Sequence, residues 1–133
     1  MRRAALSAAI GLAFVAGCGG SKSDVGSVPR ATVADPAAAG RHVFTSASAG
    51  CSGCHTFAAA GASGTLGPNL TTRVPADAEK AGKQLGSFVE QSIVSPNAYI
   101  AEGYPRNVMP QDFRDRLTQE QLAELVAFIT ANV

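Results

Sequence analysis

The residues best suited to chemistry are two cysteines and a histidine within one short stretch, Cys51, Cys54 and His55. Their C-x-x-C-H spacing is the signature of covalent haem attachment. The two vinyl groups of a haem lie on one edge of the ring, so two thiols three positions apart on a tight turn can form thioethers with both. The histidine that follows then lies over the iron as a nitrogen ligand. We therefore predict one haem c, bound covalently through Cys51 and Cys54.

Three other chemistries use the same residue types. A thioredoxin-like redox motif needs a strand-to-helix junction in an α/β domain, and the sequence shows no strand pattern around the motif. A structural zinc site needs four ligands. If the third cysteine, Cys18, carries a lipid, the remaining candidate ligands are Cys51, Cys54, His55 and His42. The adjacent Cys54 and His55 would chelate poorly. A disulfide within the motif would close too small a loop to add much stability. The residues therefore favour haem attachment.

A second axial ligand for the iron is available downstream of the motif. Met109 is the only methionine besides the initiator, and it lies in an irregular segment just before Pro110. A thioether is a soft ligand, and His/Met ligation raises the reduction potential of a c-type haem. The alternative is that Met109 fills a gap in the core, the commoner role of methionine. We predict that the fold brings Met109, Cys51, Cys54 and His55 around one cavity.

The N-terminus carries the pattern of an export signal. Arg2 and Arg3 precede an apolar run that ends in small residues, which predicts a signal peptide over residues 1–17. The apolar run is too short to span a bilayer. One interpretation is an ordinary cleaved signal peptide, in which case the position of Cys18 directly after it has no significance.

The residues around Cys18 favour a more specific interpretation. Val15-Ala16-Gly17-Cys18 resembles the lipobox of bacterial lipoproteins, which implies that Cys18 is lipidated and becomes the new N-terminus. Residues 18–34 are rich in Gly and Ser and predict a flexible membrane tether. We therefore expect the protein on the extracytoplasmic face of a bacterial membrane, held there by the lipid on Cys18.

The remaining residues, 35–133, are expected to form one domain. Lys and Arg total 11 against 10 for Asp and Glu, so no basic field suggests a nucleic-acid partner. Aromatic residues make up 6% of the chain and Trp is absent, so a dense core is difficult to build without a cofactor. No stretch shows convincing strand alternation, and we predict an all-α fold.

Local signals place the helices of this domain. Asp35-Pro36 predicts the start of a helix over 36–48, with Gly40, Phe44 and Ala47 on one face. The segment from 56 to 86 is predicted to be a loop with one helical turn near 76–81. Possible capping boxes predict two further helices, one capped by Ser87 and Glu90 and ending near Val94, and one starting at Thr118 and running to the C-terminus.

Several residues outside the haem motif resemble those of the class I c-type cytochromes. Gly40, Phe44 and Phe128 match the positions at which the terminal helices cross in that family. The resemblance implies a class I cytochrome c fold, with three to five helices around one covalently bound haem. Gly67-Pro68-Asn69-Leu70 matches the family's G-P-x-L sequence. This match implies that the carbonyl of Pro68 accepts the N–H of the proximal histidine and that Leu70 packs on the haem face.

The resemblance is more particular between residues 92 and 122. This stretch is similar to the cytochrome c domain fused to subunit II of some bacterial haem–copper oxidases, and to free relatives of that domain. Neither a copper-centre domain nor a transmembrane helix precedes the haem domain, so we do not expect this chain to be subunit II itself. Arg73, Tyr99 and Tyr104 are candidate partners for the haem propionates. A solvated surface position is the alternative for each of these three.

Two classes of function follow from these residues. The first is single-electron transfer between respiratory partners, such as a quinol-oxidising complex and a terminal oxidase, by a mobile carrier or a permanently docked subunit. The second is a haem enzyme, peroxidase-like or a sulfur-oxidising subunit, with a labile sixth ligand. The enzyme would need acid–base groups near the iron, and the sequence offers only His42, which is expected on the surface of the first helix.

Overall fold

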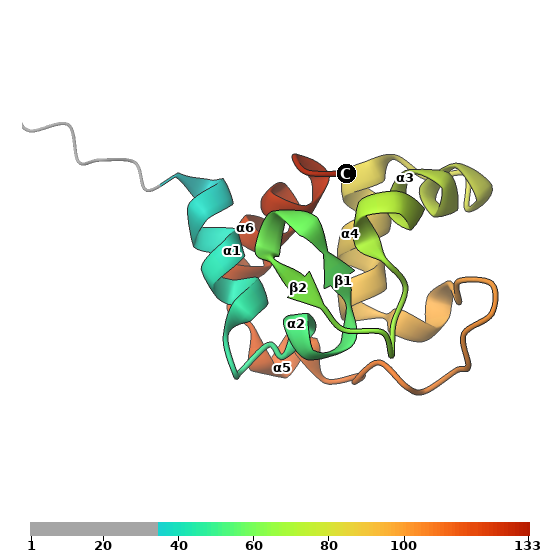
Figure 1. Cartoon of the computed structure of the whole chain (residues 1–133), viewed down its shortest axis with the longest axis horizontal. Helices are drawn as coiled ribbons and strands as arrows, with labels where there is room; N and C mark the ends of the chain where they lie inside the picture. The colour runs from blue at the N-terminus through green and yellow to red at the C-terminus, as the bar shows by residue number, and fades with distance from the viewer. Residues whose placement is uncertain (1–34) are drawn as a thin grey trace, which may run out of the picture. The chain divides into compact units, whose positions relative to one another are not determined.

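A computed structural model describes residues 35–133. The predicted signal peptide over 1–17, Cys18 and the tether up to residue 34 lie outside the described residues. Figure 1 shows that the described part is mostly helical. In chain order the elements are α1 (Pro36–Thr45), α2 (Cys51–Cys54), β1 (Thr56–Phe57), a 3₁₀ helix (Ala58–Ala60), β2 (Ala62–Ser63), α3 (Leu70–Lys80), α4 (Leu85–Val94), a second 3₁₀ helix (Pro96–Ala98), α5 (Phe113–Arg116) and α6 (Gln119–Thr130). None of these helices has the length and apolar character needed to cross a membrane.

The predicted all-α class is confirmed, with two differences of detail. The described residues form six α-helices, two of which have only four residues, where three to five were expected. They also form one small antiparallel ribbon, in which Thr56 pairs with Ser63 and Phe57 with Ala62. Each strand has two residues, which is too short to produce an alternating pattern in the sequence.

Two helix starts follow the predicted capping chemistry. The Asp35 carboxylate accepts the N–H of Ala37 at 3.0 Å, and Pro36 occupies the first position of α1. At α6, the Thr118 hydroxyl accepts the N–H of Gln121 at 3.1 Å, and the Gln121 side chain accepts the N–H of Thr118 at 2.9 Å. Helix α1 ends at Thr45, three residues earlier than predicted, and Ala47 is exposed.

The predicted start of α4 is wrong. Ser87 and Glu90 form no capping box, because the helix already begins at Leu85 after Gln84. Phe88, Val89 and Ile93 are buried, so the apolar stripe and the end at Val94 are as predicted. Leu85 also packs against the buried cluster, and the helix accordingly begins two residues before Ser87.

The prediction of a loop between 56 and 86 also fails in its second half. Helix α3 runs over Leu70–Lys80, so it includes most of the predicted turn near 76–81 but starts earlier, and it contains Pro75 although proline disfavours a helix interior. The helix forms because it buries Val74, Asp77 and Ala78 on one face. The free energy gained by tertiary burial therefore outweighs the local cost of one proline. This burial depends on distant residues, so a local sequence pattern does not predict it.

The terminal helices α1 and α6 lie side by side, as Figure 1 shows. A Cβ on Gly40 would lie 2.5 Å from the Cβ of Phe128 and would overlap the carbonyl oxygen of Glu124. Only glycine permits this close approach, because real Cβ atoms do not reach such distances. The predicted crossing at Gly40 and Phe128 is confirmed.

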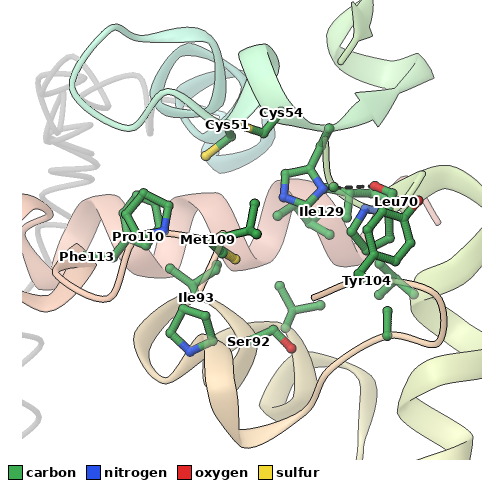
Figure 2. A pocket seen from close by; sticks show the side chains of 18 of the residues that line it. Cys51, Cys54, Leu70, Ser92, Ile93, Tyr104, Met109, Pro110, Phe113 and Ile129 are labelled. Carbon is green, nitrogen blue, oxygen red and sulfur yellow. Dashed lines mark hydrogen bonds between the residues drawn. The ribbon is translucent and has the colours of Figure 1, made fainter. Parts of the chain in front are cut away.

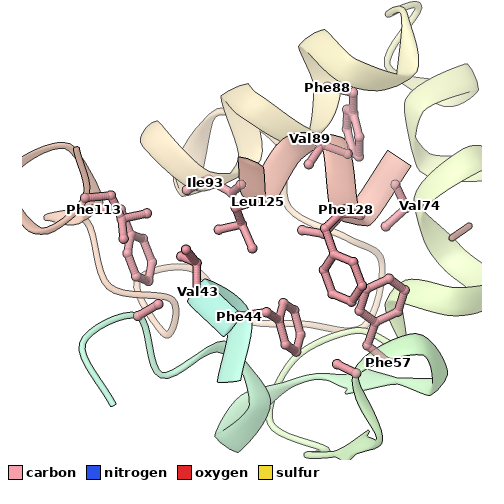
Figure 3. Close-up of a cluster of buried hydrophobic side chains, with 14 of the residues drawn as sticks. Val43, Phe44, Phe57, Val74, Phe88, Val89, Ile93, Phe113, Leu125 and Phe128 are labelled. Atoms are coloured by element: carbon pink, nitrogen blue, oxygen red, sulfur yellow. The ribbon is translucent and has the colours of Figure 1, made fainter. Parts of the chain in front are cut away.

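Three phenylalanines fill the space beneath this crossing, as Figure 3 shows. The ring of Phe57 lies 5.3 Å from the rings of both Phe44 and Phe128, at tilted and edge-on angles that aromatic pairs favour. Phe44 and Phe57 are 1% and 0% exposed. Because Phe57 follows the C-x-x-C-H motif by two residues, this cluster ties the motif to the terminal helices.

Candidate functional site

The two motif cysteines lie on a single helical turn. Helix α2 spans Cys51–Cys54 after Gly50, whose φ of +67° is in the left-handed region that favours glycine. The N–H of His55 donates to the carbonyl of Cys51 at 3.0 Å, which closes the turn. His55 then takes an extended conformation and leaves the helix. This geometry presents two thiols one turn apart with an imidazole directly behind them.

The His55 ring is held by the G-P-x-L segment. Its Nδ1 lies 2.9 Å from the carbonyl oxygen of Pro68. A carbonyl can only accept, so Nδ1 carries the hydrogen and Nε2 keeps its lone pair. Burial lowers the pKa of His55, and the Pro68 hydrogen bond offsets part of that effect. The imidazole is therefore neutral at pH 7, with one nitrogen available to a metal.

Gly67 leaves the space in which this ring lies. A Cβ at position 67 would lie 2.5 Å from Cε1 and 2.8 Å from Nδ1 of His55. The backbone also anchors there, because the N–H of Gly67 donates to the carbonyl of Cys54 at 2.8 Å. The glycine of G-P-x-L therefore lets the chain pass directly against the imidazole.

The motif opens onto a cavity of about 260 Å³. Figure 2 shows Cys51, Cys54, Met109 and Leu70 around this space. The structure brings together every residue of the folded domain that the sequence singled out, since all of them line the cavity: Cys51, Cys54, His55, Pro68, Leu70, Arg73, Tyr99, Tyr104 and Met109. Most of the other lining side chains are apolar, among them Phe44, Val89, Ile93, Leu125 and Ile129.

A family model described as cytochrome c matches residues 37–132. The chain belongs to the cytochrome c family. It is therefore an electron-carrying haem protein, in which Cys51 and Cys54 stand at the positions of covalent haem attachment. No curated protein matches the chain. His42, which had no support as a ligand, is exposed on α1 as expected.

The residues of this cytochrome fit a haem c. The donor set around the cavity comprises two thiols, a neutral imidazole and a thioether, which is the chemistry that thioether attachment and axial ligation require. The Gly67 backbone leaves room for the imidazole that a haem iron would meet. The apolar walls suit the hydrophobic face of a macrocycle.

The alternative chemistries find no support around the motif. Burial raises the pKa of the Cys51 thiol to about 11, whereas a reactive redox cysteine needs a lowered pKa. Within residues 35–133, no group of three or more His, Cys, Asp or Glu side chains is arranged to hold a metal ion. Neither a thioredoxin-like centre nor a zinc site is favoured by this geometry.

The three candidate propionate partners all line the cavity, and two of them, Arg73 and Tyr99, contact Asp77. Arg73 pairs with Asp77, with Nε 3.6 Å from Oδ2, and its guanidinium donates to the carbonyl of Glu102 at 3.4 Å. The Tyr99 hydroxyl donates to the Asp77 carboxylate at 3.1 Å. Desolvation raises the pKa of Tyr99, and the hydrogen bond to the Asp77 carboxylate raises it further. Tyr104 lines the cavity.

Asp77 is a site residue that the sequence did not suggest. It is 4% exposed and lines the cavity, which makes it the one buried charged residue in the described part of the chain. Its position four residues after Arg73 is a helical pairing signal. That signal was lost because the segment was predicted to be a loop.

Arg116 was also missed, and here the sequence carries no signal. Its guanidinium donates to the carbonyl of Ser48 at 2.6 Å, pairs with Asp112 at 3.2 Å, and lies over the ring of Phe113 at 5.1 Å. It lines the cavity and thereby joins the segment before Cys51 to the segment after Met109. The contact with Ser48 spans 68 positions, a separation that no local pattern encodes.

Proposed function

We propose that this cytochrome carries single electrons on one haem c whose axial ligands are His55 and Met109. One observation carries the proposal: the Met109 side chain lines the same cavity as Cys51, Cys54 and His55, although more than fifty residues separate it from them. Met109 is also the only methionine in residues 35–133, so it is the one thioether there that could serve as a ligand.

The chain's own residues perform three tasks in this function. Cys51 and Cys54 hold the cofactor, and Pro68 fixes the orientation of the His55 imidazole. Met109 would supply the second protein ligand to the iron, which would leave no open coordination site for oxygen or peroxide. When bound, the haem supplies a reversible one-electron change of iron valence. With the haem bound, the apolar walls would limit the access of water, so the surroundings of the iron would change little when its charge changes.

The rim of the cavity suits brief contact with another protein. Leu66 and Val108 are 65% and 49% exposed, and both line the cavity. Electron-transfer encounters use small interfaces that form and dissociate quickly. We propose redox proteins as partners, in particular a quinol-oxidising complex and a terminal oxidase. The similarity of residues 92–122 to the cytochrome c domain of haem–copper oxidase subunit II supports the oxidase.

We further propose that the domain is tethered to the extracytoplasmic face of a bacterial membrane. The lipobox-like sequence ending in Cys18 and the Gly/Ser-rich residues 18–34 support this location. A tether raises the local concentration of the carrier near membrane partners without any new contact. Cys18→Ser should move the protein from the membrane fraction to the soluble fraction of the periplasm, while Ser21→Ala should not. A Cys18→Ser variant that stays with the membrane would contradict the tether.

Carbon monoxide separates the carrier from the haem-enzyme alternative. With both axial positions taken, the reduced protein at neutral pH should bind carbon monoxide slowly and only after Met109 dissociates. A reductive titration followed by absorbance should show one reversible one-electron step. Rapid carbon monoxide binding by the wild-type protein would instead favour an enzyme with a labile sixth ligand.

Co-purification in mild detergent distinguishes a mobile carrier from a permanently docked subunit. A mobile carrier should leave membrane complexes during gentle washing. A permanently docked subunit should remain with one complex in a fixed ratio.

A further inference from the structure

The segment that carries Met109 has very little backbone structure of its own. In the described residues, the last main-chain hydrogen bond before it runs from the N–H of Tyr104 to the carbonyl of Ala101. From Pro105 to Gln111 the backbone forms no helix or strand, and its one turn lies at Arg106 and Asn107. Asn107 has a φ of +63°, in the left-handed region. Side chains must therefore supply what holds this segment in place.

One side chain supplies most of these hydrogen bonds. Asn97, in the 3₁₀ helix after α4, accepts the N–H of Asn107 on its Oδ1 at 3.0 Å. Its Nδ2 donates to Oδ1 of Asn107 at 2.6 Å and to Oε1 of Gln111 at 2.9 Å. Its backbone carbonyl accepts from Arg106 at 3.2 Å. Asn97 thus grips the chain two residues before Met109 and two residues after it.

The bonding pattern fixes the orientation of both amides. A backbone N–H can only donate, so the atom of Asn97 that faces the N–H of Asn107 is the oxygen, and the NH₂ group faces the other two partners. Gln111 in turn donates through Nε2 to the carbonyl of Met109 at 2.6 Å. A chain of hydrogen bonds therefore runs from Asn97 through Gln111 to the backbone of Met109 itself.

We propose that Asn97 is a positioning residue that holds the Met109 thioether at the haem iron. This inference rests on the proposed ligation by Met109 and adds the group that maintains it. Asn97 does not line the cavity, so it acts only through the segment it grips. An asparagine is needed because one short side chain must accept one hydrogen bond and donate two. An aspartate would place a carboxylate against the oxygens of Asn107 and Gln111.

If Asn97 holds the segment in this way, Met109 should dissociate from the iron less often. An added ligand binds only the open form, so its apparent affinity is its intrinsic affinity multiplied by the open fraction. The loss of one hydrogen bond should raise the open fraction by up to about tenfold. The reason is that the net free energy of one hydrogen bond can reach the value that corresponds to a tenfold change in an equilibrium constant. The loss of Asn97 should therefore be visible as easier displacement of Met109.

Imidazole titration of the ferric holoprotein tests this role. Asn97→Ala and Asn97→Asp should bind imidazole about tenfold or more tightly than the wild type, with haem content unchanged. Asn132→Ala is the matched control. It makes the same change at the end of α6, where Asn132 donates to the carbonyl of Phe128 at 2.7 Å. This variant should bind imidazole as the wild type does.

The outcomes separate the two proposals. If the wild type shows methionine–iron ligation and both Asn97 variants bind imidazole with wild-type affinity, the positioning role is overturned while the proposed function stands. If the wild type lacks methionine–iron ligation, the proposed ligand set fails and the positioning role fails with it. Should Asn97→Ala not fold, the exposed Gln111→Ala removes one link of the same chain. It should still raise the imidazole affinity several-fold, and an unchanged affinity would again overturn the role.

Discussion

At the scale of single residues, the site depends on the residue types beside His55. Pro68 offers only an acceptor to His55, which selects the tautomer of the ring. Gly67 has no Cβ, so the backbone can lie against the same imidazole. These two neighbours set the state and the position of the proximal ligand without contacting a metal. They show why the G-P-x-L sequence accompanies a C-x-x-C-H motif.

Asp77 provides a prediction at this scale. A buried carboxylate at the cavity wall stabilises the more positive, ferric state of a nearby iron. Asp77→Asn should therefore raise the reduction potential, by on the order of tens of millivolts. Loss of the ion pair also frees the charge of Arg73, which acts in the same direction. Potentiometric titration measures the shift.

Glu79→Gln is the control for this prediction. Glu79 lies on the same helix but is exposed, so solvent screens its charge and the potential should stay near the wild-type value. Equal shifts in the two variants would mean that burial of Asp77 has no special influence on the iron.

At the scale of elements, the crossing of α1 and α6 tests most directly how the fold is held. Gly40→Ala places a methyl group against the Glu124 carbonyl and the Phe128 side chain. Overpacking of this kind costs about 1–3 kcal/mol, more than the helix propensity gained from alanine offsets. We expect a lower free energy of unfolding in thermal or denaturant melts.

Gly86→Ala provides the matched comparison. Gly86 lies within α4, and a Cβ there would meet nothing within 4 Å. The same substitution should therefore leave stability unchanged or raise it by up to about 1 kcal/mol. A Gly40→Ala variant as stable as Gly86→Ala would show that the two helices do not require contact through glycine.

The helices also show which features can be predicted from sequence. Capping chemistry at Asp35 and Thr118 is local, and both predicted helix starts are confirmed. Helix α3 could not be predicted in the same way, because Pro75 argues against it and the burial that favours it comes from distant parts of the chain. The start of α4 was misplaced because the stripe through Phe88 governs that helix, and the Ser87 hydroxyl does not.

The site follows the same rule. The cysteine motif and the lone downstream methionine are visible as residue types at fixed positions, so their meeting in one cavity could be predicted. Asn97 and Arg116 act through contacts with residues 10 or more positions away in sequence. Their roles appear only when the chain is folded, because polar side chains of these types are common on any surface.

At the scale of the whole molecule, the cofactor completes the core. Phe44, Leu125 and Ile129 belong to the buried cluster and also line the cavity. These side chains therefore connect the walls of the cavity to the rest of the core. We therefore expect the haem to stabilise the folded domain, as any group that binds only the folded state does.

Removal of the haem should therefore destabilise the entire domain. A Cys51→Ala/Cys54→Ala double variant, which cannot form thioethers, should lose helical content and unfold at a lower temperature with reduced cooperativity. Circular dichroism at far-ultraviolet wavelengths measures both changes. Ser52→Ala keeps the motif intact and should melt like the wild type. A haem-free double variant with the helix content and melting curve of the wild type would contradict a structural role for the cofactor.

The central claim is that one iron is held between His55 and Met109, and the spectrum of the ferric protein tests it most directly. Methionine sulfur bound to ferric haem iron gives a charge-transfer band near the red end of the spectrum. We predict that the wild type shows this band, that Val108→Ala keeps it, and that Met109→Ala loses it together with a fall in reduction potential. A wild-type protein without the band, or a Met109→Ala variant that retains it, would contradict the account.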